Sequence, residues 1–205
     1  MDAEDALERR QIAFDALRSE APPVPRLHLG FEIMLDQPLP EAVLRDARFA
    51  LAGSRYYLVE FYLSVAAESA QVVLRRISDA GKVPLVAHAE RYDACNVETM
   101  RAWRAAGAKI QVDARALVGS TARGRNARQL VAAGLADVVA ADNHADTRTM
   151  KPGEGFFAER GYVEVGQLLC IENPRAVVED GEMRDAPPIP LREKLWSRVK
   201  GVVGI

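Results

Sequence analysis

The sequence predicts an α/β fold of the βα-barrel class, in which parallel strands alternate with helices. Short apolar runs of strand length recur along the chain, and the stretches between them are long enough to form helices. The runs end on residues that can bind a metal ion, and these residues are Glu32, Glu60, His88, Asp113 and Asp142. Because βα barrels collect their chemistry at the carboxyl ends of the strands, this pattern predicts a polynuclear metal site of hydrolytic type.

The composition is that of one globular domain. A chain of 205 residues can enclose one sizeable core, and the formal net charge of −2 argues against a nucleic-acid partner. Cys95 and Cys170 lie far apart without metal-finger spacing, so we expect reduced thiols in a cytoplasmic protein. No apolar stretch reaches membrane-spanning length, and the charged start is unlike a signal peptide.

The individual elements follow from hydrophobic periodicity and from helix-ending Gly and Pro residues. The predicted strands cover residues 27–35, 56–61, 83–87, 109–112 and 137–141. The predicted helices cover residues 2–19, 39–51, 64–80, 97–106, 125–133, 156–160 and 163–170, and Asn173-Pro174 opens a last one. We expect Ile12 and Leu17 on the apolar side of the first helix and Val72 and Ile77 on that of the third. Residues 147–155 are predicted to form a loop over the strand ends.

The chain divides into a barrel domain, residues 1–184, and a tail, residues 185–205. Residues 185–190 form a Pro-rich linker. Residues 191–203 are apolar with Arg and Lys interleaved, as in a basic amphipathic helix. Such a helix could touch a membrane surface or an acidic partner, and the alternative is a helix packed on the barrel.

His88 and Arg91 belong to one short segment that follows a predicted buried strand. An imidazole that emerges there beside Glu90 is well placed to bind a metal ion or a phosphate. The guanidinium of Arg91 matches the oxygens of a phosphate. The alternatives are a histidine satisfied within the core and an arginine on the surface.

The segment 142–146 holds two carboxylates and an imidazole. Asp142 and His144 are two residues apart, so an extended backbone points both side chains the same way, toward one ion or two. The alternative is a polar turn, which Asp and Asn also favour.

Glu32 and Glu60 lie in apolar strands, where a carboxylate is costly to desolvate without a cation. A metal ion or a neighbouring arginine could supply that cation. Oxygen ligands combined with imidazole suit Mn, Zn or Fe better than a cysteine-based zinc site. Asp113 is a weaker candidate, since it can pair with Arg115 or cap the following turn.

Four motifs, in order, resemble the bacterial tyrosine phosphatases of the polymerase-and-histidinol-phosphatase (PHP) superfamily. They are Gly30-Phe-Glu32-Ile, Tyr57-Leu-Val-Glu60-Phe61, Val86-Ala-His88-Ala-Glu90-Arg91-Tyr92 and Ala141-Asp142-Asn143-His144. Those enzymes depend on manganese and are encoded with capsular and exopolysaccharide genes. The similarity covers nearly all of the chain, and the Ala-His-x-Glu-Arg stretch is its most specific part.

The resemblance implies a distorted βα barrel of the PHP type with two or three divalent ions, Mn²⁺ in the family, with Zn or Fe as alternatives. It implies hydrolysis of phosphotyrosine on a bacterial tyrosine autokinase that regulates polysaccharide synthesis or export. Carried over by position, the metal ligands are Glu32, Glu60, His88, Asp142 and His144, and the catalytic pair is His88 and Arg91, with Arg91 engaging the phosphate. Membrane contact is expected to be indirect or through the basic tail.

The sequence departs from the family pattern near its start. Family members open with a strand carrying His-x-His and a second strand ending in Thr-Pro-His, and neither motif precedes His88 here. We therefore expect a barrel that is incomplete at the N-terminus, through either a misplaced start or a true truncation. Two other functions stay open: a PHP-type phosphoesterase acting on a small phosphate ester, and a catalytically inactive kinase-binding protein.

Overall fold

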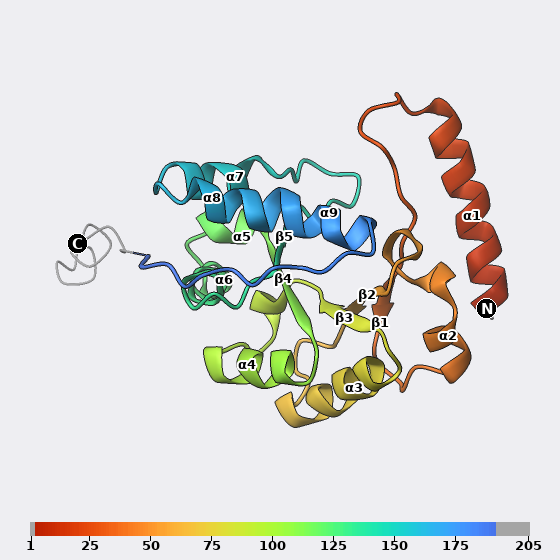
Figure 1. Ribbon diagram of the computed structural model, residues 1–205, viewed down its shortest axis with the longest axis horizontal. Helices are drawn as coiled ribbons and strands as arrows, with labels where there is room; N and C mark the ends of the chain where they lie inside the picture. The colour runs from red at the N-terminus through yellow and green to blue at the C-terminus, as the bar shows by residue number, and fades with distance from the viewer. Residues whose placement is uncertain (1–2, 192–205) are drawn as a thin grey trace.

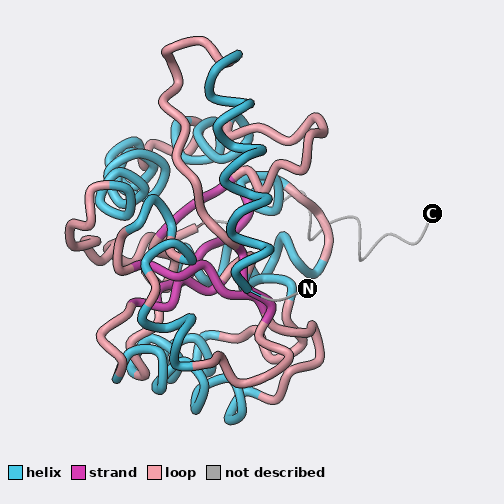
Figure 2. Tube along the Cα trace, turned by 90° about the vertical axis from the view of Figure 1, so that its right-hand side faces the viewer, coloured by secondary structure: helices cyan, strands magenta, loops and turns pink. Residues whose placement is uncertain are grey.

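The computed structural model describes residues 3–191, and within them one parallel sheet forms the centre of the molecule (Figures 1 and 2). Its strands are β1 (Glu32–Met34), β2 (Tyr56–Glu60), β3 (Val83–Val86), β4 (Lys109–Asp113) and β5 (Val138–Ala140). They lie side by side in chain order, and every neighbouring pair is parallel. The predicted α/β class is therefore confirmed.

Helices surround this sheet. They are α1 (Ala3–Glu20), α2 (Glu41–Arg45), α3 (Ala67–Asp79), α4 (Val97–Ala105), α5 (Ala114–Val118), α6 (Ala122–Ala132), α7 (Lys151–Ala158), α8 (Val163–Gln167) and α9 (Asn173–Val178). Short helical turns cover Ala47–Phe49, Leu51–Gly53, Ala89–Arg91 and Leu168–Glu172. In Figure 1, α3 and α4 lie below the sheet, α7, α8 and α9 lie above it, and α1 stands at the side. None of the helices in the described part of the chain is both long and apolar enough to cross a membrane.

The outer face of the sheet carries the main core. Side chains alternate between the two faces of a strand, and Tyr57, Val59, Val86, Ile110 and Val112 all belong to one buried cluster with the surrounding helices. An aromatic group closes the cluster on the α4 side: the ring centroids of Phe61, Tyr92 and Trp103 lie 5.8 to 6.1 Å apart.

The inner face is smaller and curled. Tyr56, Leu85 and Val138 pack there against Val177 of α9 and against Met183. The curling brings the first and last strands close, because ligand atoms of Glu32 in β1 and of Asp142 after β5 lie within 4.8 Å of each other. Within the described residues β1 pairs only with β2 and β5 only with β4, so this barrel-like sheet has two edges.

Residues 183–191 lie against the body of the molecule. Ala186 and Ile189 are buried, and the Ile189 amide donates to the carbonyl of Ala132 at the end of α6. The Tyr162 hydroxyl donates to the carbonyl of Pro190. The domain boundary at residue 184 stays a prediction, and the basic tail lies outside the described residues except for Leu191.

Several predicted boundaries were wrong. The first strand covers three residues rather than nine, because its earlier part runs as extended chain with little ladder pairing. The helix expected over 39–51 is three short turns, since the Asp46 side chain caps a new turn by accepting from the Arg48 amide.

Other differences lie after β4. The loop predicted over residues 147–155 ends at Met150 in the structure. Helix α7 follows it and has Pro152 in its first turn, a position that proline favours. Helix α5 was not predicted, and α6 begins three residues earlier than expected. The helix expected over 163–170 is α8 followed by a π-helical turn.

The predicted apolar faces were correct only in part. In α3, Ile77 is buried as expected, together with Ala70 and Leu74, whereas Val72 is 70% exposed. Ile12 and Leu17 are exposed in α1. A surface helix can carry isolated apolar side chains in solvent, so periodicity alone does not fix which side is covered.

Candidate metal centre

The inner face of the sheet positions the acidic side chains. Residues paired in register share a face, and β1–β2 pairing sets Glu32 opposite Leu58 and Met34 opposite Glu60. Glu60 is the last residue of β2, and His88 comes two residues after β3. Glu32 begins β1 rather than ending it, yet its long side chain reaches the same group.

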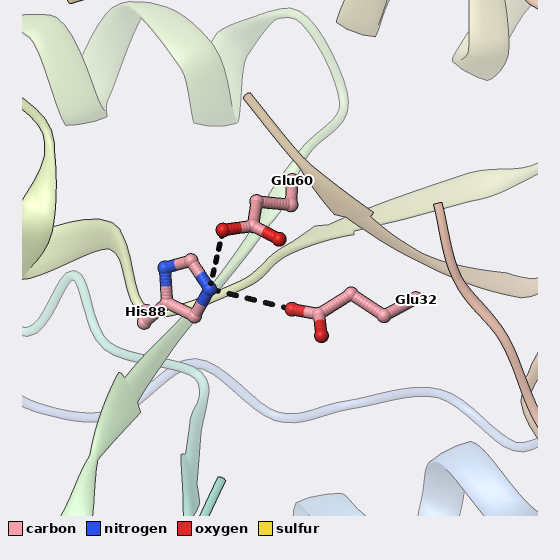
Figure 3. A group of neighbouring side chains, drawn as sticks. All are labelled: Glu32, Glu60 and His88. Atoms are coloured by element: carbon pink, nitrogen blue, oxygen red, sulfur yellow. Dashed lines mark ion pairs between the residues drawn. The ribbon is translucent and has the colours of Figure 1, made fainter. Parts of the chain in front are cut away.

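The first group of ligand atoms is formed by Glu32, Glu60 and His88 (Figure 3). The Nε2 atom of His88 lies 3.3 Å from Oε1 of Glu32 and 3.2 Å from Oε1 of Glu60. The His88 side chain is 3% exposed, whereas those of Glu32 and Glu60 are 29% and 26% exposed. The carboxylates therefore face an opening, and the imidazole lies at its floor.

The donor set and spacing fit a divalent metal ion. An ion bound about 2.1 Å from each ligand atom places two ligand atoms roughly 3 to 4 Å apart. The two measured distances lie in that range, and oxygen with imidazole nitrogen suits a transition metal. The alternative of an arginine partner for each glutamate is not what the structure records, since both carboxylates face His88.

A second group shares Glu32 and adds Asp142 and His144. Asp142 follows β5 and His144 is more exposed, with 62% of its side chain in solvent. The predicted polar turn is present as well, because the side chain of Asn143 accepts from the Ala145 amide and that of Asp146 from the Arg148 amide. The turn residues and the ligand residues thus alternate along one loop.

Two guanidinium groups converge on Asp142. Arg91 pairs with Asp142 and lies 2.6 Å from Asp113, and Arg148 lies 2.7 Å from Asp142. Arg148 also contacts Nδ1 of His144 at 2.8 Å. Asp113 therefore pairs with Arg91 rather than with Arg115, and its side chain makes no capping hydrogen bond to α5, so neither suggested role for it was correct.

The side chains of the segment after β3 have separate structural roles. Tyr92 holds the strand ends together, since its hydroxyl donates to the carbonyl of Ala87 and accepts from the Phe61 amide. Burial raises the pKa of Tyr92, so the phenol stays protonated. Burial, followed by the negative charge of Asp113, raises the pKa of Glu90 to about 8.

Unusual backbone geometry marks both ends of the site. His88 has φ 32° and ψ 52°, and Asp142 has φ 48°. Residues with a Cβ rarely adopt this left-handed region, and such residues concentrate at functional sites. The chain turns sharply after β3 and β5, and each turn leaves a ligand-type side chain facing the same opening.

The structure thus brings all five predicted ligand residues into two groups joined by Glu32, with Arg91 beside them. Sequence reasoning missed Arg148, which reaches the site from a loop, and Gln111, a buried amide in β4. The only available signal for Arg148 was its place after an Asp- and His-rich turn. His88 Nδ1 and Glu90 Oε2 are buried without a hydrogen-bond partner among the described residues.

Comparisons with known proteins identify the fold and the family of this chain. The structure is similar to a chain in the crystal structures of YwqE from Bacillus subtilis and CpsB from Streptococcus pneumoniae, described as unique metal-dependent tyrosine phosphatases. The TM-score is 0.74 at 23% identity, over 91% of this chain and 77% of that chain. A family model for capsular polysaccharide synthesis, CpsB/CapC, matches residues 2–179. The family resemblance and the fold predicted from the motifs are confirmed, and the chain belongs to the CpsB/CapC family.

Proposed function

We propose that this protein is a metal-dependent protein-tyrosine phosphatase that acts in the cytoplasm on phosphotyrosine of a bacterial kinase regulating capsule synthesis. The observation that carries the proposal is the pair of ligand groups joined by Glu32, with Arg91 and Arg148 beside them. Carboxylates and imidazole for cations, next to guanidinium groups for a phosphate, form the donor set that phosphoester hydrolysis requires.

In this proposal the metal ligands are Glu32, Glu60, His88, Asp142 and His144, and the ions are Mn²⁺. A carboxylate-rich set with two imidazoles favours Mn²⁺ over a zinc site built from thiolates. When bound, such ions polarise the phosphate and make a water molecule more acidic. The side chain of Glu32 belongs to both groups, which supports a centre of at least two ions.

Arg91 and Arg148 bind and orient the phosphate. Carboxylates hold both guanidinium groups: Asp113 lies 2.6 Å from Arg91, Asp146 lies 2.7 Å from Arg148, and Asp142 pairs with both. These contacts fix the direction of each planar fork, so that it can donate to phosphate oxygens in pairs. Their side chains are each 22% exposed, which leaves both within reach of a ligand.

An apolar cavity beside the ligand groups favours an aromatic ester over a small polar one. It measures about 320 Å³, and its lining includes Leu58, Leu85, Val138 and Val177 as well as Glu32 and Asp142. A phenyl ring attached to a phosphate at the ligand groups would lie against these side chains. Burial of such a ring is worth about 1.5 to 3 kcal/mol, or roughly tenfold to 100-fold in kcat/KM.

The test is hydrolysis with Mn²⁺ of a phosphotyrosine peptide compared with small alkyl phosphates, including histidinol phosphate. We expect kcat/KM to be at least about tenfold higher for the phosphotyrosine peptide. A preference for the alkyl phosphates would favour another phosphoesterase activity. Binding of the peptide without turnover at saturating metal would favour an inactive kinase-binding protein.

A further inference from the structure

Gln111 is a buried amide at the centre of β4 whose side chain lies on the inner face of the sheet. It is 4% exposed, and the flanking Ile110 and Val112 point into the outer core. Register pairs Gln111 with Val138 of β5, which also lines the inner cavity. A buried amide is stable only when its polar atoms are bonded, so its partners indicate what it is for.

The first partner is the backbone of His88. The amide of Ala87 still donates to the carbonyl of Val59 in β2, and the sheet ladder ends there. The next amide, that of His88, donates to Oε1 of Gln111 at 2.6 Å. The carboxamide therefore satisfies a buried backbone donor at the point where the chain leaves β3.

That bond fixes a strained residue. His88 adopts the left-handed conformation, which is strained for a residue other than glycine and persists only where neighbouring contacts impose it. The same conformation is the one in which Nε2 of His88 lies between Glu32 and Glu60. Loss of the bond would leave the His88 amide buried and free to relax toward a common conformation.

The second partner is Asp113. Nε2 of Gln111 lies 3.4 Å from Oδ1 of Asp113, and the other oxygen of Asp113 holds Arg91 at 2.6 Å. One side chain thus contacts both the histidine of the first ligand group and the carboxylate that orients a guanidinium. The oxygen of the carboxamide accepts one bond and its nitrogen donates the other, so the two bonds together define the orientation of the side chain.

We infer that Gln111 is a positioning residue that holds His88 in its metal-binding conformation and, through Asp113, sets the orientation of Arg91. This inference rests on the proposed function for the meaning of the two groups. The hydrogen bonds themselves are independent of it. Gln111 also borders the apolar cavity, but in this scheme it contacts neither the phosphate nor the ion and affects both through His88 and Asp113.

The main test compares Gln111→Met, which keeps the length of the side chain and removes both bonds, with Gln129→Met on the exposed surface of α6. We expect Gln111→Met to weaken Mn²⁺ binding, measured by calorimetric titration, by about tenfold to 100-fold. We expect Gln129→Met to bind Mn²⁺ as the wild type does. Unchanged Mn²⁺ affinity in Gln111→Met would overturn the inference.

Gln111→Glu separates the two bonds. A carboxylate still accepts from the His88 amide but can no longer donate to Asp113, and it repels that carboxylate. We expect Mn²⁺ affinity at least equal to that of the wild type, together with a KM for the phosphotyrosine peptide that rises by about tenfold. A loss of Mn²⁺ affinity equal to that of Gln111→Met would contradict the role assigned to the His88 bond.

A readout without metal or substrate distinguishes this inference from the proposed function. Amide hydrogen exchange of His88, followed by NMR in the presence of EDTA, should be at least about tenfold faster in Gln111→Met than in the wild type. Equal exchange rates would refute the bond. If the exchange rates differ but the protein hydrolyses no phosphotyrosine, Gln111 still positions His88 and the proposed function is wrong.

Discussion

The two ends of strands β4 and β5 carry charged clusters of opposite character. At the amino ends, Arg104, Lys109, Asp137 and Asp185 form what we term the basal cluster. At the carboxyl ends lies the candidate metal centre. Both clusters contain a nearly or fully buried group, Asp137 in one and His88 in the other. They differ in how completely the buried atoms are bonded.

The basal cluster is fully bonded within the protein. One oxygen of Asp137 accepts from the Ile110 amide at 2.8 Å, and the other lies 3.1 Å from Arg104 and 3.3 Å from Lys109. The carbonyl of Asp137 accepts from the side chain of Asn173, which ties α9 to β5. Every polar atom of this buried aspartate therefore has a partner from another element.

The candidate metal centre is not fully hydrogen-bonded within the protein. His88 Nδ1 and Glu90 Oε2 have no partner among the described residues, and Glu32 lies close to Glu60 in one ligand group and to Asp142 in the other. Uncompensated charge is costly in a folded protein unless a ligand balances it. The basal cluster therefore stabilises the fold, whereas the other end keeps charge available for a ligand.

The largest expected effect is loss of function in His88→Ala. Removing the imidazole takes a donor from the first ligand group, and we expect turnover of a phosphotyrosine peptide at saturating Mn²⁺ to fall by about 1000-fold or more. Fewer bound Mn²⁺ ions should be measured by metal analysis after dialysis. Gln129→Ala, on the exposed surface of α6, is the control. Retained turnover and retained metal in His88→Ala would show that His88 is not a ligand of the candidate metal centre.

The next effect concerns stability rather than function. Asp137→Ala leaves the Ile110 amide and two cations without their buried partner, so we expect the free energy of unfolding to fall by about 3 kcal/mol. Urea denaturation in EDTA measures it. Mn²⁺ affinity of the folded variant should not change. A loss below about 1 kcal/mol would mean that the basal cluster does not stabilise the fold.

Replacing a carboxyl group of the candidate metal centre with a neutral amide should raise the free energy of unfolding instead of lowering it. Glu90→Gln replaces an unpartnered buried oxygen with an amide that can donate to Asp113. We expect the metal-free protein to gain about 1 kcal/mol of unfolding free energy, measured by urea denaturation at pH 7.5. A loss of stability would show that Glu90 is satisfied as a carboxylate, and the contrast between the two ends would then weaken.

The smallest effect is a pH-dependent one in the basal cluster. The hydrogen bond from Lys109, assisted by Arg104, holds the pKa of Asp185 below its ordinary value. Stability from such a group is present above the ordinary carboxyl pKa and is lost as pH falls through the lower folded pKa. Asp185 is mostly exposed, so we expect Asp185→Asn to cost less than about 1 kcal/mol at pH 7. Thermal melts should show the difference shrinking below about pH 4. A difference that grows toward low pH would be inconsistent with this pairing.

The sequence predicted the elements and residues whose signals are local. Apolar runs ending in an acidic residue or a histidine marked the strands, and the site residues after β2, β3 and β5 meet because parallel strands share one carboxyl end. Glu32 reaches them from the start of β1. It could not predict contacts that depend on backbone turns. Arg148 reaches Asp142 only because the side chains of Asn143 and Asp146 fold the loop. In the sequence, Gln111 looks like any other polar residue of a strand, because its contact with His88 depends on the register between β3 and β4.

The closeness of β1 and β5 gives the ion a structural role that chelation would reveal. Glu32 and Asp142 stand about 110 residues apart in the chain, so a cation shared between them cross-links a long loop of the unfolded polypeptide. Such a clasp would hold the first and last strands of the sheet together without a hydrogen bond between them. Removing it should therefore loosen the two borders of the sheet before the middle, and limited proteolysis would begin near them.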